Sequence, residues 1–113
     1  MVSYPMIQVP MIVLEEKKAT LRKPTYKITV GKWRKFTSDR RYKAFARAFI
    51  ESAEIISVDD IDDSLAKELG YNSRAEYLAN GWNDEYDERL LIRWSKIEIY
   101  WDVVEAMGVF DGF

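Results

Sequence analysis

The chain contains neither cysteine nor histidine among its 113 residues. Their absence excludes disulfide bridges, zinc sites of the usual ligand set, histidine-based catalytic triads and imidazole general bases. Any chemistry must therefore come from carboxylates, lysine, arginine or hydroxyl groups, with the tyrosines as lesser candidates. Nothing in the sequence indicates a bound cofactor.

Long apolar runs are also missing. The longest, such as residues 11–14, are far shorter than the roughly 20 residues that cross a bilayer. The N-terminus does not show a basic region followed by a long apolar stretch, which a secretory signal has. We therefore expect a cytoplasmic protein that does not bind membranes, with residues 1–113 forming a single domain because a chain of this length supports one core.

Acidic residues are scarce in the first half of the chain, and basic residues are scarce in the second half. The formal net charge is −2, but residues 1–50 contain twelve Lys or Arg and three acids, whereas residues 51–113 contain five and sixteen. Such asymmetry is typical of a protein that turns one surface towards a polyanion. The alternative is that the two halves interleave in the fold and neutralise each other.

Local patterns predict an α+β order of elements. Proline near the start predicts a short helix over residues 10–17, and glycines end two further helices. Residues 42–58 fit a helix or a strand equally well, except that 55–58 are extended. The other expected elements are strands 25–30 and 33–37 about a turn at Gly31, helices 59–69 and 73–81, strand 89–99, and a C-terminal helix or tail within 100–113.

Acidic residues crowd the start of the helix expected over residues 59–69. Oxygen ligands of this kind suit Mg²⁺ or Ca²⁺, but the run lacks the glycine and the spacing of a calcium loop. Carboxylates in the first turn of a helix instead accept hydrogen bonds from free backbone N–H groups. We therefore predict helix capping here and no metal site.

The most suggestive stretch is EEKKATLRK at residues 15–23. Lys17, Arg22 and Lys23 supply positive charge, Arg22 can bind two phosphate oxygens at once, and the Thr20 hydroxyl can donate a further hydrogen bond. The alternative is a solvated helix end with Glu–Lys surface pairs.

A second basic stretch, GKWRKF at residues 31–36, interleaves cations with aromatic rings. Single-stranded nucleic acid is bound in this way, because bases stack on aromatic rings while phosphates meet the cations. Trp33 is equally well explained as a core residue. The loop 38–43 extends the basic character. The predicted nucleic-acid contacts are Lys17, Lys18, Thr20, Arg22, Lys23, Lys27, Lys32, Trp33, Arg34, Arg40 and Arg41.

Several of these stretches together resemble the ASCH domain, a branch of the PUA-like proteins. The likeness lies in KKATLRKP at 17–24, VGKWRKF at 30–36, DDIDDSLAKELGYNSRAEYL at 59–78 and LLIRWSKIEI at 90–99, and it covers about residues 11–99. It implies a small PUA-like mixed β-barrel, six-stranded or similarly closed, with short helices at its ends and a cleft edged by the lysine-threonine-arginine run. It also implies RNA binding and, in some members, action on nucleic acids or modified nucleosides.

Within that resemblance, the acetylcytidine amidohydrolases use a lysine, a threonine and a carboxylate. The lysine corresponds to Lys17 and the threonine to Thr20, whereas the carboxylate falls on Leu69. Leucine can neither accept nor relay a proton, and Glu68 should point elsewhere because one residue turns a helix by about 100°. Asp62 or Asp63 could substitute only if the loop differed.

Three functions follow from these observations. The first is a nucleic-acid-binding module that takes RNA, or less readily single-stranded DNA, on its basic half. The second is a hydrolase that acts on a modified nucleoside or RNA with Lys17 and Thr20. The third is a small interaction domain whose basic half docks on an acidic partner, which includes a second copy of the chain and hence a homo-oligomer.

Overall fold

The fold is described from a computed structural model, which describes residues 1–38, 43–80 and 87–110. These residues form a five-stranded sheet in the order β1-β3-β4-β5-β2, in which β1 runs parallel to β3 and the other neighbours are antiparallel. The strands are β1 (Val2–Tyr4), β2 (Ala19–Arg22), β3 (Trp33–Ser38), β4 (Ala46–Ser57) and β5 (Glu88–Ile99).

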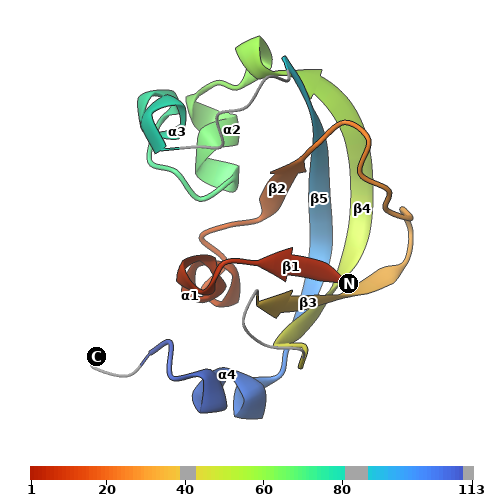
Figure 1. Cartoon of the computed structure of the whole chain (residues 1–113), viewed down its shortest axis with the longest axis vertical. Coiled ribbons are helices and arrows are strands. Elements are labelled where there is room, and N and C mark those ends of the chain that lie inside the picture. Colours follow the sequence, from red (N-terminus) through yellow and green to blue (C-terminus); the bar gives the residue numbers. More distant parts are fainter. Residues whose placement is uncertain (39–42, 81–86, 111–113) are drawn as a thin grey trace.

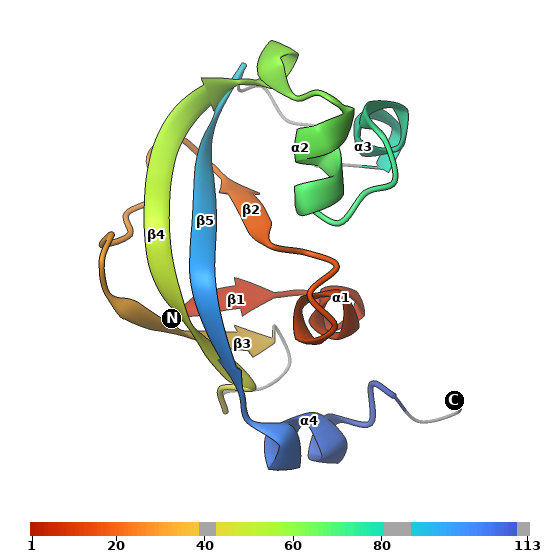
Figure 2. The ribbon, with the colours of Figure 1, turned by 180° about the vertical axis from the view of Figure 1, so that it is seen from behind.

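The sheet curls into half a barrel, and short helices lie along it and at its ends (Figures 1 and 2). The helices are α1 (Val9–Val13), α2 (Asp63–Glu68), α3 (Arg74–Asn80) and α4 (Trp101–Met107), with 3₁₀ turns at Met6–Gln8 and Val58–Asp60. The expected α+β class is confirmed. Among the described residues the sheet has five strands and remains open, because β1 and β2 lie at its two edges.

The long β4–β5 ribbon carries the curvature. Register shifts on either side of Ile50 mark β-bulges, which bend a strand and increase its twist. The segment that fitted helix and strand equally well is therefore a strand over Ala46–Ser57, with Ala46, Ala48 and Ile50 on the buried face. The segment is a strand because it pairs with β3 on one side and β5 on the other, which gives its backbone N–H and C=O groups hydrogen-bond partners on both edges.

Phe36 lies at the centre of the larger core. Its ring packs edge-on against Tyr4 and Trp94, with centroid distances of 5.0 Å in both cases, and 6.5 Å from Phe45. Phe36 is fully buried and so joins β1, β3 and β5 in one aromatic cluster.

Helices α2 and α3 pack near the start of β5 through a second cluster that includes Leu65, Tyr77 and Leu91. The predicted capping of α2 is confirmed, because an Asp62 carboxylate oxygen accepts a hydrogen bond from the Leu65 N–H at 2.8 Å. Ser73 caps α3 in the same way, accepting from the Glu76 N–H at 3.1 Å. Helix α3 therefore begins where the sequence indicated, whereas α2 begins at Asp63, later than the expected residue 59, because a separate 3₁₀ turn occupies Val58–Asp60.

The N-terminal third differs most from expectation. The strand predicted over 25–30 is wrong: the segment has no strand pairing, and Tyr26 and Ile28 pack on the core from irregular backbone. Strands β1 and β2 were not predicted, and the helix expected over 10–17 ends at Val13. Alternating burial arises in irregular segments too, whereas a strand exists only where a partner completes its hydrogen bonds.

The basic and acidic halves interleave in part. Strand β5, from the acidic half, lies between β2 and β4. On the sheet, Arg47 donates hydrogen bonds to Glu98 across the β4–β5 pair, at 2.7 and 2.9 Å. Some of the opposite charge is thus paired within the sheet. Among the described residues, no helix is long and apolar enough to span a membrane.

Candidate functional site

A cleft of about 220 Å³ opens between β2, the segment before α1, the α2–α3 pair and the start of β5. These elements approach one another on one side of the sheet (Figure 2). The cleft is lined by Pro5, Gln8, Lys17, Thr20, Leu21, Arg22, Leu69, Tyr71, Tyr77 and Arg89. Three of the residues singled out from the sequence, Lys17, Thr20 and Arg22, therefore share one site.

A tight reversal of the chain places Lys17 in this cleft. Helix α1 ends at Val13, and Glu15 adopts the left-handed conformation with φ of 60°. The N–H groups of Glu16 and Lys17 then both donate to the Met11 carbonyl, at 2.8 and 3.0 Å. The Lys17 side chain turns inward and is only 4% exposed.

The Lys17 ammonium caps the end of α2. Its Nζ donates a 2.9 Å hydrogen bond to the carbonyl oxygen of Leu69, the C-cap residue of that helix. Terminal carbonyls of a helix lack intrahelical partners and attract cations. Gly70 follows with φ of 98°, and a Cβ there would lie 3.5 Å from the Lys17 Cβ and 2.6 Å from the Met11 Cε. Glycine adopts this positive φ without strain, whereas a larger residue here would be strained and would displace the Met11 side chain.

Burial changes the chemistry of Lys17. Loss of solvent, and secondarily the positive charge of Arg22, lowers the pKa of its ammonium from 10.5 to about 7. At neutral pH a substantial fraction of the side chain is therefore an uncharged amine, which is able to accept a proton.

Arg22 forms the neighbouring wall. Its Nη2 donates to the Ser3 carbonyl at 2.7 Å, and its guanidinium lies 5.1 Å from the Tyr4 ring centroid and 5.6 Å from that of Tyr26. The Arg22 Nε is buried without a hydrogen-bond partner, and so is the Tyr4 hydroxyl. Burial raises the pKa of Tyr4, and the nearby Arg22 charge opposes that rise. Arg22 is thus positioned by the Ser3 carbonyl and the two rings, while its Nε lacks an acceptor.

The sequence did not single out Arg89 as a site residue, and it brought in the two cleft tyrosines, Tyr71 and Tyr77, only as lesser candidates for chemistry. Arg89 is 2% exposed at the start of β5, and its Nη1 donates to the Glu88 carbonyl at 3.0 Å. Tyr71 and Tyr77 meet edge to face with ring centroids 5.4 Å apart. A usable signal for Arg89 was an arginine directly before the apolar run of a strand expected to be buried. The tyrosines carried only a weak signal, because aromatic residues between helices usually belong to the core.

Comparison with known proteins defines the fold. No model of a known protein family matches the chain, and no curated protein matches it. The ASCH protein of Zymomonas mobilis is similar in structure: a serine-to-alanine variant superposes with a TM-score of 0.67 at 11% identity, covering 84% of this chain and 66% of that one. The chain has the ASCH fold.

Two further crystal structures of the Zymomonas mobilis ASCH protein agree. A tyrosine-to-phenylalanine variant gives a TM-score of 0.57, and the ASCH protein itself 0.54, both at 12% identity over 84% of this chain. The chain spans 65–67% of the length of these three proteins. An identity this low shows the fold alone, so the chemistry of the cleft is argued from its own residues.

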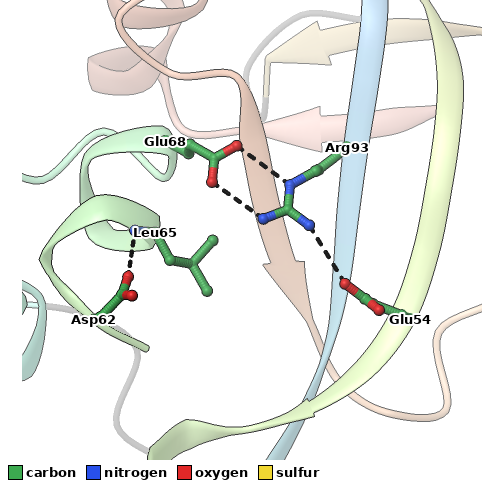
Figure 3. A network of polar contacts seen from close by, with 5 residues as sticks. All are labelled: Glu54, Asp62, Leu65, Glu68 and Arg93. Atoms are coloured by element: carbon green, nitrogen blue, oxygen red, sulfur yellow. Dashed lines mark hydrogen bonds and ion pairs between the residues drawn. The ribbon is translucent and has the colours of Figure 1, made fainter. Parts of the chain in front are cut away.

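The acid expected from the resemblance to the amidohydrolases is not among the described residues that line the cleft. Leu69 does line the cleft beside Lys17 and Thr20, but it offers only its backbone oxygen. The neighbouring Glu68 points away, as its place on the helix predicted, and accepts hydrogen bonds from Arg93 at 3.1 and 3.2 Å (Figure 3). Arg93 also contacts Glu54 at 3.3 Å. Glu68 is thus engaged elsewhere.

Asp62 and Asp63 do not replace the missing acid. Asp62 caps α2 (Figure 3), and Asp63 accepts a 2.8 Å hydrogen bond from the Arg74 N–H. Among the described residues that line the cleft, none is an aspartate or a glutamate. The described wall of the cleft is therefore basic, aromatic and apolar.

The remaining predicted contacts do not line the cleft. Trp33 is 41% exposed, with the Arg47 guanidinium 4.7 Å from its ring centroid and Phe49 edge-on at 5.9 Å. Arg34 is half-buried. Arg40 and Arg41 lie outside the described residues. The other predicted cations are exposed on the surface: Lys18, Lys23, Lys27 and Lys32.

Proposed function

We propose that the chain is an RNA-binding module whose cleft receives one unpaired nucleotide. The observation that carries the proposal is the composition of the cleft. Its lining includes three cations, Lys17, Arg22 and Arg89, and two tyrosines, Tyr71 and Tyr77. None of the described lining residues is an acid. A nucleotide offers a phosphate for the cations and an aromatic face for the tyrosines.

The dimensions of the cleft favour a single unpaired nucleotide over a duplex. Its volume of about 220 Å³ lies below the ~300–1,000 Å³ of pockets that enclose drug-sized ligands, so it has room for part of one nucleotide and not for a base pair. Bases in single-stranded loops and ends can be turned out and stacked on aromatic side chains, whereas paired bases cannot. The exposed lysines at 18, 23, 27 and 32 would add attraction for the backbone that does not depend on sequence.

Fluorescence anisotropy with labelled single-stranded RNA, double-stranded RNA and single-stranded DNA tests this function. We expect single-stranded RNA to bind most tightly, with an affinity that falls as salt rises because phosphate neutralisation releases counterions. Arg22→Gln should weaken binding by roughly tenfold or more, since a hydrogen bond to a charged group contributes about 1.5–3 kcal/mol.

The matched control is Arg47→Gln. It removes the same charge from the outer face of the sheet, where Arg47 contacts Trp33 and Glu98. We expect it to change the affinity little. Equal losses in the two variants would show that overall charge, not the cleft, drives binding, and absence of binding to every probe would overturn the function.

A hydrolase that acts on a modified nucleoside or RNA is the second candidate, and the lowered pKa of Lys17 favours it. A lysine that is partly neutral at pH 7 can take a proton from the Thr20 hydroxyl or from water as that oxygen attacks a carbonyl or phosphoryl centre. Thr20 is 5% exposed and lines the same cleft.

The pH dependence of turnover tests this candidate on acetylated cytidine and on single-stranded RNA. A lysine base works only when deprotonated, so we expect the rate to rise as pH increases through about 7. Thr20→Val, which keeps the shape and removes the hydroxyl, should reduce turnover by at least about 100-fold, the lower range for loss of acid–base assistance. Undiminished turnover in Lys17→Ala would exclude the mechanism.

A further inference from the structure

Two cations that line the cleft, Lys17 and Arg22, have N–H groups for which the described residues show no acceptor. The Lys17 ammonium has three N–H groups, and one of them is used by the Leu69 carbonyl. The Arg22 Nε is buried with no partner. Because an unmet buried donor is costly, such a cluster indicates that an acceptor-rich anion completes the site.

The depth of the cations restricts which anion can reach them. Lys17 is 4% exposed and Arg89 2%, so each presents only a small part of its surface to a ligand that enters the cleft. An internal phosphodiester carries a nucleotide on both sides and must lie along a surface. A terminal phosphate is attached on one side only and can enter first.

Charge and hydrogen-bonding capacity favour the same group. A phosphate monoester carries about −1.5 to −2 at pH 7 and has three strong acceptor oxygens. A diester carries a single negative charge on two such oxygens. Lys17 and Arg22 lie close enough for the charge of one to lower the pKa of the other, so a dianion relieves more of their repulsion than a monoanion does.

We propose that the cleft selects the phosphate monoester of a nucleotide, the group at a phosphorylated RNA end, over the phosphodiesters inside a chain. The proposal rests on the nucleotide binding proposed above. Lys17 and Arg22 bind the phosphate, while Tyr71 and Tyr77 contact the base attached to it.

This selectivity has a pH signature. The second ionisation of a phosphate monoester occurs near pH 6, so the dianion gains as pH rises. Lys17 loses its proton near pH 7, so binding of an anion weakens above that value. Affinity for a monoester should therefore peak between the two values. A phosphodiester, which stays singly charged, should show only the fall above about pH 7.

No other described group in the cleft distorts that profile. The ionisable side chains that line the cleft together with Lys17 are Arg22 from β2, Arg89 from β5, and Tyr71 and Tyr77 from the α2–α3 region. Arginine stays protonated throughout, and tyrosine ordinarily titrates near pH 10. Burial raises the pKa of Tyr71 further.

The test compares one short single-stranded RNA in three forms, with a 5′-phosphate, with a 3′-phosphate and with neither, by anisotropy from pH 5.5 to pH 8.5. The corresponding nucleoside monophosphates are titrated separately by calorimetry. We expect one phosphorylated form to bind about tenfold more tightly than the unphosphorylated form. Lys17→Met should abolish that difference, whereas Arg47→Gln should retain it, with circular dichroism confirming that both variants are folded.

The remaining outcomes distinguish failure of the end selectivity from failure of the RNA-binding function. Equal affinity for all three RNAs, still reduced by Arg22→Gln, would overturn the end selectivity and leave RNA binding standing. Binding of nucleoside monophosphates but of no RNA would support the monoester site with a free nucleotide as its ligand and overturn the RNA function. Binding of neither would overturn both.

Discussion

Replacing Lys17 by methionine is expected to stabilise the protein by roughly 2–4 kcal/mol at pH 6. Each unit of pKa shift is about 1.4 kcal/mol, and burial lowers the pKa of Lys17 from 10.5 to about 7. The ammonium therefore opposes folding by roughly 4–5 kcal/mol at most. Methionine has a similar length and no charge, and loss of the hydrogen bond to Leu69 offsets about 1–2 kcal/mol of the gain.

The gain depends on pH with a definite sign. Between pH 7 and pH 10.5 the unfolded chain keeps the Lys17 proton and the folded protein has lost it. Because the unfolded state then binds more protons, the free energy of unfolding of the wild type rises with pH in this window. Below pH 7 both states are protonated and the full penalty applies. The advantage of Lys17→Met should therefore shrink as pH rises from 7 to 10.

Urea unfolding at pH 6 and pH 9 measures this effect. Lys18→Met is the matched control, since it makes the same substitution one residue away on an exposed side chain, and we expect it to change the free energy of unfolding by less than about 0.5 kcal/mol. Destabilisation by Lys17→Met at pH 6, or an unchanged pH dependence, would contradict the assigned burial of the charge. A buried lysine that weakens the fold suits a group retained for its function.

Replacing Phe36 by alanine should cost about 3–5 kcal/mol, the usual range for truncating a fully buried phenylalanine. Phe36 contacts Tyr4, Phe45 and Trp94, so its loss opens a cavity among β1, β3 and β5. Such a cost is a large share of the about 5–15 kcal/mol that stabilises a typical domain. Tyr4 also lies against Arg22, so the wall of the cleft should loosen as well.

Phe49→Ala is the control for this variant. Phe49 is only half-buried, on the outer face of the same sheet beside Trp33 and Lys96. We expect its truncation to cost about 1 kcal/mol, near the centre of the usual range for point mutants. Thermal unfolding followed by circular dichroism compares the two variants, and similar costs would show that Phe36 is not the centre of the core.

Local sequence determined the elements whose signals are local. Asp62, Ser73 and Gly70 mark where α2 and α3 begin or end, because caps and left-handed glycines act within a few residues. The apolar run of β5 was equally plain. The motif around residues 17–22 also brought Lys17, Thr20 and Arg22 forward as candidate site residues, and all three line the cleft.

Tertiary structure decided the rest. Residues 25–30 carry a strand pattern without a partner, while residues 19–22 become β2 because β5 lies beside them. Arg89 and Lys17 are more than 70 residues apart in the sequence, and they line the same cleft only because the sheet curls. Strand pairing and loss of solvent both depend on what packs against a residue, so neither the edges of the sheet nor the lowered pKa of Lys17 could be read from its neighbours in the chain.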